Sequence, residues 1–277
     1  MPRSELHFAL NHMIAPQLGL SDFFALARAV GLRKVEIRND ISANAILDGT
    51  SANEVRRLAN NADVEIISIN ALQRFNDWSE ERAEEARILL RFAAGCGAKA
   101  LVLVPVNDGS GRANGERQGN LRVALKALKP LLNDHGIVGL VECLGFETCS
   151  LRSKREAVDA INSIEGDSVF RIVHDTFHHH LAGEEDIFPE MTGLVHISGV
   201  SDTDIGVSEM RDEHRGLIDS HDRLHNLEQM SALLNQGYSG PFSFEPFAEE
   251  LRALENPART ISESIDSIRT NLVSQAA

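Results

Sequence analysis

Short apolar runs alternate with longer amphipathic stretches along the chain, and this alternation constrains the fold more than any other feature. Apolar runs of this length are typical of buried parallel strands, and the stretches between them have the periodicity of helices. Eight strand-helix repeats in 277 residues predict a single (β/α)8 TIM barrel, formed as one domain over residues 1–277. The predicted strands are 7–12, 34–38, 64–71, 100–106, 137–143, 170–175, 193–198 and 241–247.

Two connections depart from the even repeat. Residues 183–193, after the sixth strand, leave little room for a full helix, and a long loop is expected over residues 200–226. A doubly wound open sheet is the alternative fold. It is disfavoured because no glycine-rich phosphate-binding fingerprint follows the first strand.

The charge balance limits the partners that the chain is expected to bind. With 27 basic and 41 acidic residues the formal charge is −14, which disfavours a nucleic acid or an anionic membrane as partner. The three cysteines, Cys96, Cys143 and Cys149, show no paired metal-binding spacing and predict no disulfide framework. No apolar run is long enough to cross a bilayer. We expect a cytoplasmic protein with a small neutral substrate, and the sequence leaves open whether it forms a homo-oligomer.

Four consecutive predicted strands carry a side chain that can bind a metal, at or near the strand end. They are Glu142, Asp175, His196 and Glu245. In a (β/α)8 barrel the carboxyl ends of all strands open on one face, where the chemistry is found. Because strand side chains alternate, Glu142 and Glu245 are expected to point into the barrel mouth.

Isolated carboxylates at this position would be unfavourable, because burial and mutual repulsion both oppose their charges. A single such residue is most often a helix cap or half of an ion pair. Four on successive strands favour a divalent cation instead. Three carboxylates and one imidazole suit Mn2+, Zn2+, Mg2+ or Co2+.

Asp175 is followed by three histidines, His178 to His180. At least two of the three are expected to be exposed loop residues. His178 is the exception, since histidines next to a metal centre often orient its carboxylate ligands. His174, His179 and His180 have no assigned function.

From VECLGFETC through HDTFHHHLAG and LVHISGVSD to GYSGPFSFEPF, the chain resembles the xylose isomerase-like TIM-barrel family. Within that family it looks most like the inosose isomerases of inositol catabolism, which act on 2-keto-myo-inositol. The resemblance implies that Glu142, Asp175, His196 and Glu245 bind one divalent metal ion, with Mn2+ or Zn2+ foremost. It also implies that His178 and Arg215 orient the substrate.

One departure from the family concerns the loop after the seventh strand. Many relatives follow the arginine with a Gly-x-Gly turn, whereas this chain reads RGLIDSHDRLHN, so the substrate pocket is expected to differ. Glu147 is a candidate for a further glutamate that many epimerases use, and Asn11 is a candidate substrate contact. Weaker candidates at the same face are His12, Glu36, Arg38, Arg74 and Trp78.

The resemblance implies a metal-dependent isomerase whose substrate is a small neutral polyhydroxy ketone. A metal would stabilise an enediolate, and Glu142 and Glu245 would act as acid and base. The nearest alternative is a ketose 3-epimerase or another sugar isomerase. A dehydratase and a non-catalytic sugar-binding barrel also remain open. A DNA-repair endonuclease of the same superfamily is disfavoured by the charge and by the number of ligands.

Overall fold

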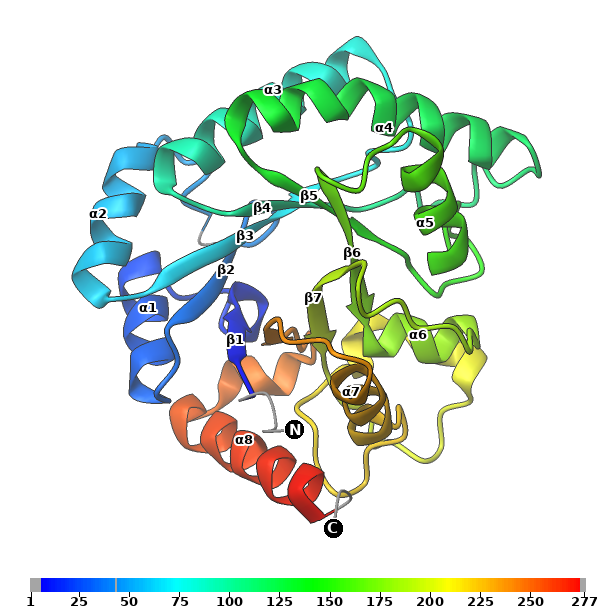
Figure 1. Ribbon diagram of the computed structural model, residues 1–277. Helices are drawn as coiled ribbons and strands as arrows, with labels where there is room; N and C mark the ends of the chain where they lie inside the picture. Colours follow the sequence, from blue (N-terminus) through cyan, green and yellow to red (C-terminus); the bar gives the residue numbers. More distant parts are fainter. Residues whose placement is uncertain (1–5, 43, 275–277) are drawn as a thin grey trace.

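The computed structural model describes residues 6–42 and 44–274, and its strands close into a parallel barrel (Figure 1). Each strand pairs with its neighbours in chain order, and the first strand pairs with the last. This closure confirms the (β/α)8 barrel and excludes the open sheet. The strands are β1 (Phe8–Asn11), β2 (Lys34–Arg38), β3 (Glu65–Leu72), β4 (Ala100–Leu103), β5 (Val138–Glu142), β6 (Phe170–Asp175), β7 (Thr192–Ile197) and β8 (Phe242–Phe244).

The α-helices follow the strands in turn and cover the outside of the barrel (Figure 1). They are α1 (Leu20–Ala29), α2 (Ala52–Ala62), α3 (Glu80–Cys96), α4 (Glu116–His135), α5 (Lys154–Ser163), α6 (Thr176–Ala182), α7 (Asn226–Asn235) and α8 (Pro257–Ser274). Short 3-10 turns are η1 (His12–Ile14), η2 (Val207–Glu209), η3 (Asp212–His214) and η4 (Glu249–Ala253). Within the described ranges, no helix has the length and hydropathy of a membrane span.

Helix α6 begins directly at the end of β6, where exposed loop histidines were expected. Asp175 is its N-cap, and Oδ1 of Asp175 accepts a hydrogen bond from the backbone N–H of His178 at 3.0 Å. His178 to His180 therefore lie on a helix, and His178 is buried. Residues 183–193 contain no helix, as their length predicted.

Strand alternation separates the apolar side chains into two layers. Phe242 and Phe244 face outward and belong to the large core between the sheet and the helices. Leu140, Val173 and Leu194 belong to a smaller cluster that fills the barrel interior. Glu142, Asp175 and His196 each lie two residues after one of these side chains. They therefore point to the same side of the sheet, toward the mouth of the barrel.

The long loop after β7 folds back over the barrel mouth. The backbones of Gly199 and Gly216 exchange two hydrogen bonds, at 2.9 and 2.8 Å. A Cβ atom on Gly199 would lie 2.6 Å from the carbonyl oxygen of Leu217, so only glycine permits this approach. The contact places Arg215, the residue before Gly216, inside the molecule with 1% of its surface exposed.

Candidate metal centre

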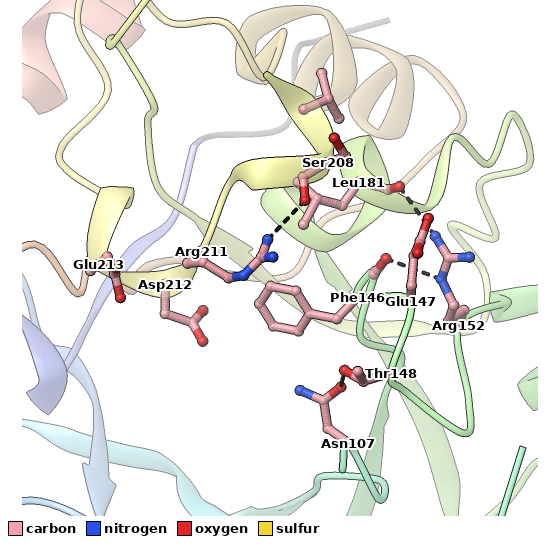
Figure 2. Close-up of a pocket in the computed structure, with 12 residues that line it drawn as sticks. Asn107, Phe146, Glu147, Thr148, Arg152, Leu181, Ser208, Arg211, Asp212 and Glu213 are labelled. Carbon is pink, nitrogen blue, oxygen red and sulfur yellow. Dashed lines mark hydrogen bonds between the residues drawn. The ribbon is translucent and has the colours of Figure 1, made fainter. Parts of the chain in front are cut away.

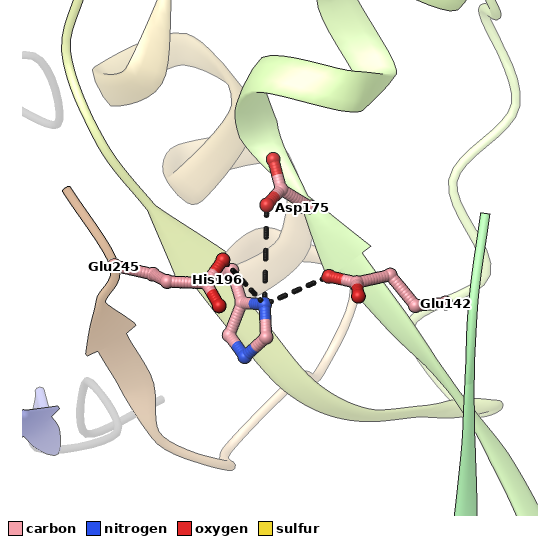
Figure 3. A group of neighbouring side chains, drawn as sticks. All are labelled: Glu142, Asp175, His196 and Glu245. Carbon is pink, nitrogen blue, oxygen red and sulfur yellow. Dashed lines mark hydrogen bonds and ion pairs between the residues drawn. The ribbon is translucent and has the colours of Figure 1, made fainter. Parts of the chain in front are cut away.

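The carboxyl ends of the last four strands bring four side chains together. Glu142 and Asp175 end β5 and β6, His196 lies one residue before the end of β7, and Glu245 directly follows β8. All four are buried, and one ligand atom from each lies within 4.8 Å of the others (Figure 3). The four residues that the sequence predicted as ligands therefore form one group that could hold a metal ion.

Nδ1 of His196 is the atom on which the three carboxylates converge (Figure 3). It lies 2.9 Å from Oε1 of Glu142 and 3.2 Å from Oε2 of Glu245, and Oδ2 of Asp175 is 3.9 Å away. Carboxylates so close together repel one another unless a positive charge lies among them. The set of three carboxylates and one imidazole matches the preferences of Mn2+, Zn2+, Mg2+ and Co2+.

The second ring nitrogen of His196 is held by another carboxylate. Nε2 lies 3.2 Å from Oε2 of Glu36, which is fully buried. Glu36 also accepts hydrogen bonds from the hydroxyl of Ser68, at 2.5 Å, and from the hydroxyl of Ser243. Because an ionised carboxylate only accepts, Nε2 keeps its proton and Nδ1 is the nitrogen left for a cation or a second proton. Glu36, one of the weaker candidates for a substrate contact, thus holds the imidazole of His196 and has a structural role in this site.

The buried cluster carries an excess of negative charge. Burial by itself would lower the pKa of His196, but the charges of Glu245 and Glu36 raise it well above its ordinary value. The raised pKa means that a second proton on His196 offsets part of the negative charge of the carboxylates. A divalent cation at the same place would offset this charge as well. Negative charge is in excess, since four buried carboxylates (Glu36, Glu142, Asp175 and Glu245) face two guanidinium groups (Arg38 and Arg215), and these two also pair with Asp40 and Asp212. The residues present therefore fit one divalent ion.

Two buried arginines hold the carboxylate of Glu245. Nη1 of Arg38 donates to Oε1 of Glu245 at 2.6 Å, and Nη2 of Arg215 donates to Oε2 at 3.0 Å. The same Nη2 atom donates to Oδ2 of Asp175 at 2.7 Å. Burial by itself would raise the pKa of Glu245, but the charges of His196 and the two arginines lower it well below its ordinary value. Glu245 is therefore held in its ionised form.

The carboxylate of Glu142 has fewer hydrogen-bond partners than that of Glu245. Within the described residues its carboxylate has one hydrogen-bond partner, Nδ1 of His196, and Oε2 is left without one. Burial raises the pKa of Glu142 above its ordinary value, even though the hydrogen bond and the charge of His196 lower it. The two glutamates thus differ in environment, as an acid and a base do in proton-transfer sites.

A cavity of about 340 Å³ adjoins the group, and Glu142, Glu245, Arg38 and Arg215 line it. His178 lines it as well, with a buried ring whose Nδ1 atom has no hydrogen-bond partner in the described chain. The ring of His178 does not hold a carboxylate, since the contact with Asp175 is made by its backbone N–H. The imidazole of His178 therefore lines the cavity with one ring nitrogen unpaired in the described chain.

The other two predicted substrate contacts lie elsewhere. Asn11 is fully buried, and its Nδ2 atom donates to Oε1 of Glu36 and to Oε1 of Glu245, both at 3.2 Å. It supports the carboxylates and is absent from the lining of the inner cavity. Glu147 is exposed and lines a second, outer cavity. Of the three residues, Arg215 alone lines the inner cavity.

The weaker candidates are spread over different environments. The ring of His12 stacks on Phe23 with the ring centres 4.1 Å apart, outside the site. Arg74 lines the inner cavity and forms an ion pair with Asp108 at 2.5 Å. Trp78 packs against the outer core and does not wall the inner cavity.

The unassigned histidines lie outside the ligand group. His174 faces away from the mouth, and its Nε2 atom lies 2.9 Å from Oε1 of Gln229. Nδ1 of His179 lies 2.5 Å from Nζ of Lys154, a buried lysine at the start of α5. His180 is half-buried on α6.

Two residues of the site were missed by the sequence analysis. Asn70, near the end of β3, donates from Nδ2 to Oε1 of Glu245 at 3.2 Å. Its position at a strand end is a signal that could have identified it. Phe247 lies beyond β8, and its ring centre is 4.7 Å from the guanidinium carbon of Arg215 and 5.5 Å from that of Arg38. The predicted strand 241–247 included Phe247, but β8 ends at Phe244, so strand alternation does not place this residue.

The fold agrees with the comparisons to known proteins. Residues 24–271 match the xylose isomerase-like TIM barrel family, and the chain belongs to this family. The chain is 36% identical to a xylose isomerase domain-containing protein from Salmonella typhimurium, over 99% of both chains, with a TM-score of 0.89. It is 27% identical over 212 residues to an inosose isomerase from Bacillus licheniformis, covering 72% of this chain and 74% of the relative. It also matches the IolI protein, solved with a zinc atom, at 20% identity over 98% of this chain and 99% of that one, with a TM-score of 0.83. A D-psicose 3-epimerase from Clostridium cellulolyticum shares the fold, at 14% identity over 96% of this chain and 99% of that one, with a TM-score of 0.73.

Proposed function

We propose that this protein is a divalent-metal-dependent isomerase of inososes, which moves a ketone to a neighbouring ring carbon. The observation that carries the proposal is the convergence of three carboxylates on Nδ1 of His196 beside a cavity of about 340 Å³. The identity shared with an inosose isomerase supports the choice of substrate. The substrate is a small neutral polyhydroxy ketone, and neither nucleic acid nor a membrane is a partner.

Glu142, Asp175, His196 and Glu245 would hold the ion, with Mn2+ or Zn2+ preferred. Such an ion acts as a Lewis acid that lowers the cost of removing a proton from the carbon beside a carbonyl. The buried hydrogen bond between His196 and Glu36 orients the imidazole with Nδ1 toward the carboxylates of Glu142 and Glu245, where it would serve as a ligand.

Proton transfer is assigned to the two glutamates, which approach the imidazole from opposite sides in Figure 3. Glu142 has a carboxylate oxygen without a partner, and it lines the cavity. Glu245 is kept ionised by Arg38 and Arg215. A positioned acid or base contributes about 10²- to 10⁴-fold to such a reaction. Arg215 and His178, which both line the cavity, orient the hydroxyl groups and stabilise the developing negative charge.

A ketose 3-epimerase is the second candidate, because the same proton transfer inverts a carbon when the proton returns to the opposite face. The ligand group serves both reactions equally. Which one occurs depends on how the cavity holds the hydroxyl groups of the substrate. The products of inososes and of ketoses, compared by NMR, separate the two candidates.

The test begins with metal analysis of the purified protein. The metal-loaded protein is then incubated with inososes and ketoses in deuterium oxide, and incorporation beside the carbonyl is measured by NMR. We expect deuterium in both the inosose and its positional isomer. A protein that retains no divalent ion and exchanges no proton in any of these compounds would instead be a non-catalytic sugar-binding barrel.

The proposed compartment is the cytoplasm. Cys96, Cys143 and Cys149 are all buried as free thiols, which fits a reducing environment.

A further inference from the structure

A second, larger cavity of about 820 Å³ lies beside the inner one. Three residues, Asn107, Phe146 and Asp212, line both cavities. Figure 2 shows the ring of Phe146 between Asn107 on one side and Asp212 on the other. The two cavities therefore adjoin at Phe146 and share its ring as part of their lining.

The inner cavity is sufficient for a single small ring. Ligand-binding cavities measure roughly 300–1,000 Å³, and the inner cavity of about 340 Å³ is near the lower end of this range. The outer cavity is more than twice as large. A free inosose would leave it empty, so the proposed function by itself gives it no occupant.

The lining of the outer cavity suits a polyhydroxy ligand. The ring of Phe146 offers an apolar face on which the C–H groups of a sugar ring can pack. Around it are groups that donate to and accept from hydroxyls. They are the hydroxyls of Thr148 and Ser208, the carboxylates of Glu147 and Glu213, and the guanidinium groups of Arg152 and Arg211.

The charges of the outer cavity favour a neutral ligand. Glu147 and Glu213 balance Arg152 and Arg211, while Asp212 is paired with Arg215 at 3.1 Å. The two arginines of the lining form no ion pair within the described residues. Backbone carbonyls position them instead: Nη1 of Arg211 donates to the carbonyl oxygens of Ser208 and Met210 at 2.9 and 2.7 Å, and Nε of Arg152 donates to that of Gly145 at 3.0 Å.

We propose that the outer cavity is a subsite for a second, glycosidically linked sugar ring. The substrate is then a ketone-bearing ring that carries a neutral glycosyl group. The ketone ring occupies the inner cavity, and the linkage passes Phe146. This inference rests on the proposed function and adds the substrate class to it.

The test compares 2-keto-myo-inositol with its O-glucosyl derivative. We expect kcat/KM for the glucosyl compound to be at least tenfold higher. Equal values, or a preference for the free ring, would overturn the subsite. If neither compound reacts, the proposed function fails, and calorimetry then decides the subsite separately with unreactive myo-inositol and its O-glucosyl derivative. A Kd at least tenfold lower for the glucosyl compound supports the subsite, and equal Kd values reject it.

Two variants test whether the outer cavity causes the preference for the glucosyl compound. Arg211→Ala removes a donor of the outer cavity, and Ser208→Phe fills the cavity from an exposed position that tolerates a large side chain. Both are expected to bring the ratio of the two kcat/KM values, or of the two Kd values, close to one. The matched control is Arg122→Ala, an exposed arginine of α4 that also donates to a backbone carbonyl, that of Gln118. The control should keep the ratio of the unmodified protein. A ratio unchanged in both Arg211→Ala and Ser208→Phe contradicts the proposal.

Discussion

Glu36 and His196 are 160 residues apart in the chain, and Oε2 of Glu36 lies 3.2 Å from Nε2 of His196. Glu36 is surrounded by donors, since Ser68, Ser243 and Asn11 also donate to it. This carboxylate orients the imidazole of the ligand group and increases the basicity of its other nitrogen.

Replacing this carboxylate should weaken metal binding. In Glu36→Gln the amide presents N–H groups to donors, so the orientation of His196 is disturbed. We expect the affinity for Mn2+ or Zn2+ to fall by about 10- to 100-fold, measured by competition with a chelator. Glu65→Gln, at the exposed start of β3, is the control. Equal affinities in the two variants would show that Glu36 does not support the site.

Glu245→Gln should abolish turnover and leave the fold intact. The carboxylate of Glu245 accepts from Arg38, Arg215, Asn11 and Asn70, and an amide cannot accept from all four or carry a proton. We expect deuterium exchange to fall by at least about 10²-fold with an unchanged circular dichroism spectrum. Near-normal exchange in this variant would remove Glu245 from the mechanism.

Divalent metal should stabilise the folded protein. An ion at 100 times its Kd contributes about 2.7 kcal/mol. For a chain of 277 residues, this corresponds to a rise in Tm of roughly 5 °C. Scanning calorimetry with and without Mn2+ or Zn2+ measures the rise. His196→Ala should abolish the rise, and its persistence in that variant would place the ion elsewhere.

Acidification should destabilise the protein through His12. Burial lowers the pKa of His12 to about 4, with Arg38 adding to the effect and the hydrogen bond to Leu18 opposing it. The unfolded chain, with a pKa of about 6.5, binds more protons between these values. The stabilisation is therefore complete above pH of about 6.5 and is lost as the pH falls toward 4, by about 3 kcal/mol.

Urea unfolding between pH 7 and 4.5 tests this dependence. His12→Gln should lower the stability at pH 7 and flatten its dependence on pH. His7→Gln, at an exposed position five residues earlier, should leave the slope as it is. Equal slopes in the two variants would show that other groups cause the acid sensitivity.

Gly145 allows α6 to pack against the loop after β5, and any larger residue should disturb the site. A Cβ atom there would meet the carbonyl oxygen of His178 and would lie 2.6 Å from Cβ of Leu181. We expect Gly145→Ala to lower the free energy of unfolding by about 1–3 kcal/mol and to reduce exchange activity. Gly119→Ala, in an open position of α4, should stabilise by roughly 0.5–1 kcal/mol. Two variants that change stability in the same direction would contradict the packing argument.

The sequence by itself determined the barrel and the ligand group. Alternating apolar runs specify the strands, and the two-residue period of a strand directs Glu142, Asp175, His196 and Glu245 toward one mouth. These properties are local, because each follows from a residue and its near neighbours in the chain.

Only the tertiary structure decided which polar residues support the ligands and which face the cavity. Asn11 ends β1 and Glu36 lies in the middle of β2, and they hydrogen-bond to the ligands Glu245 and His196 instead of lining the inner cavity. Glu147 was a candidate substrate contact by resemblance to epimerases, and it lines the outer cavity. The physical reason is that these contacts join strands far apart in sequence. They depend on barrel closure, strand register and side-chain rotamers, none of which a local period encodes.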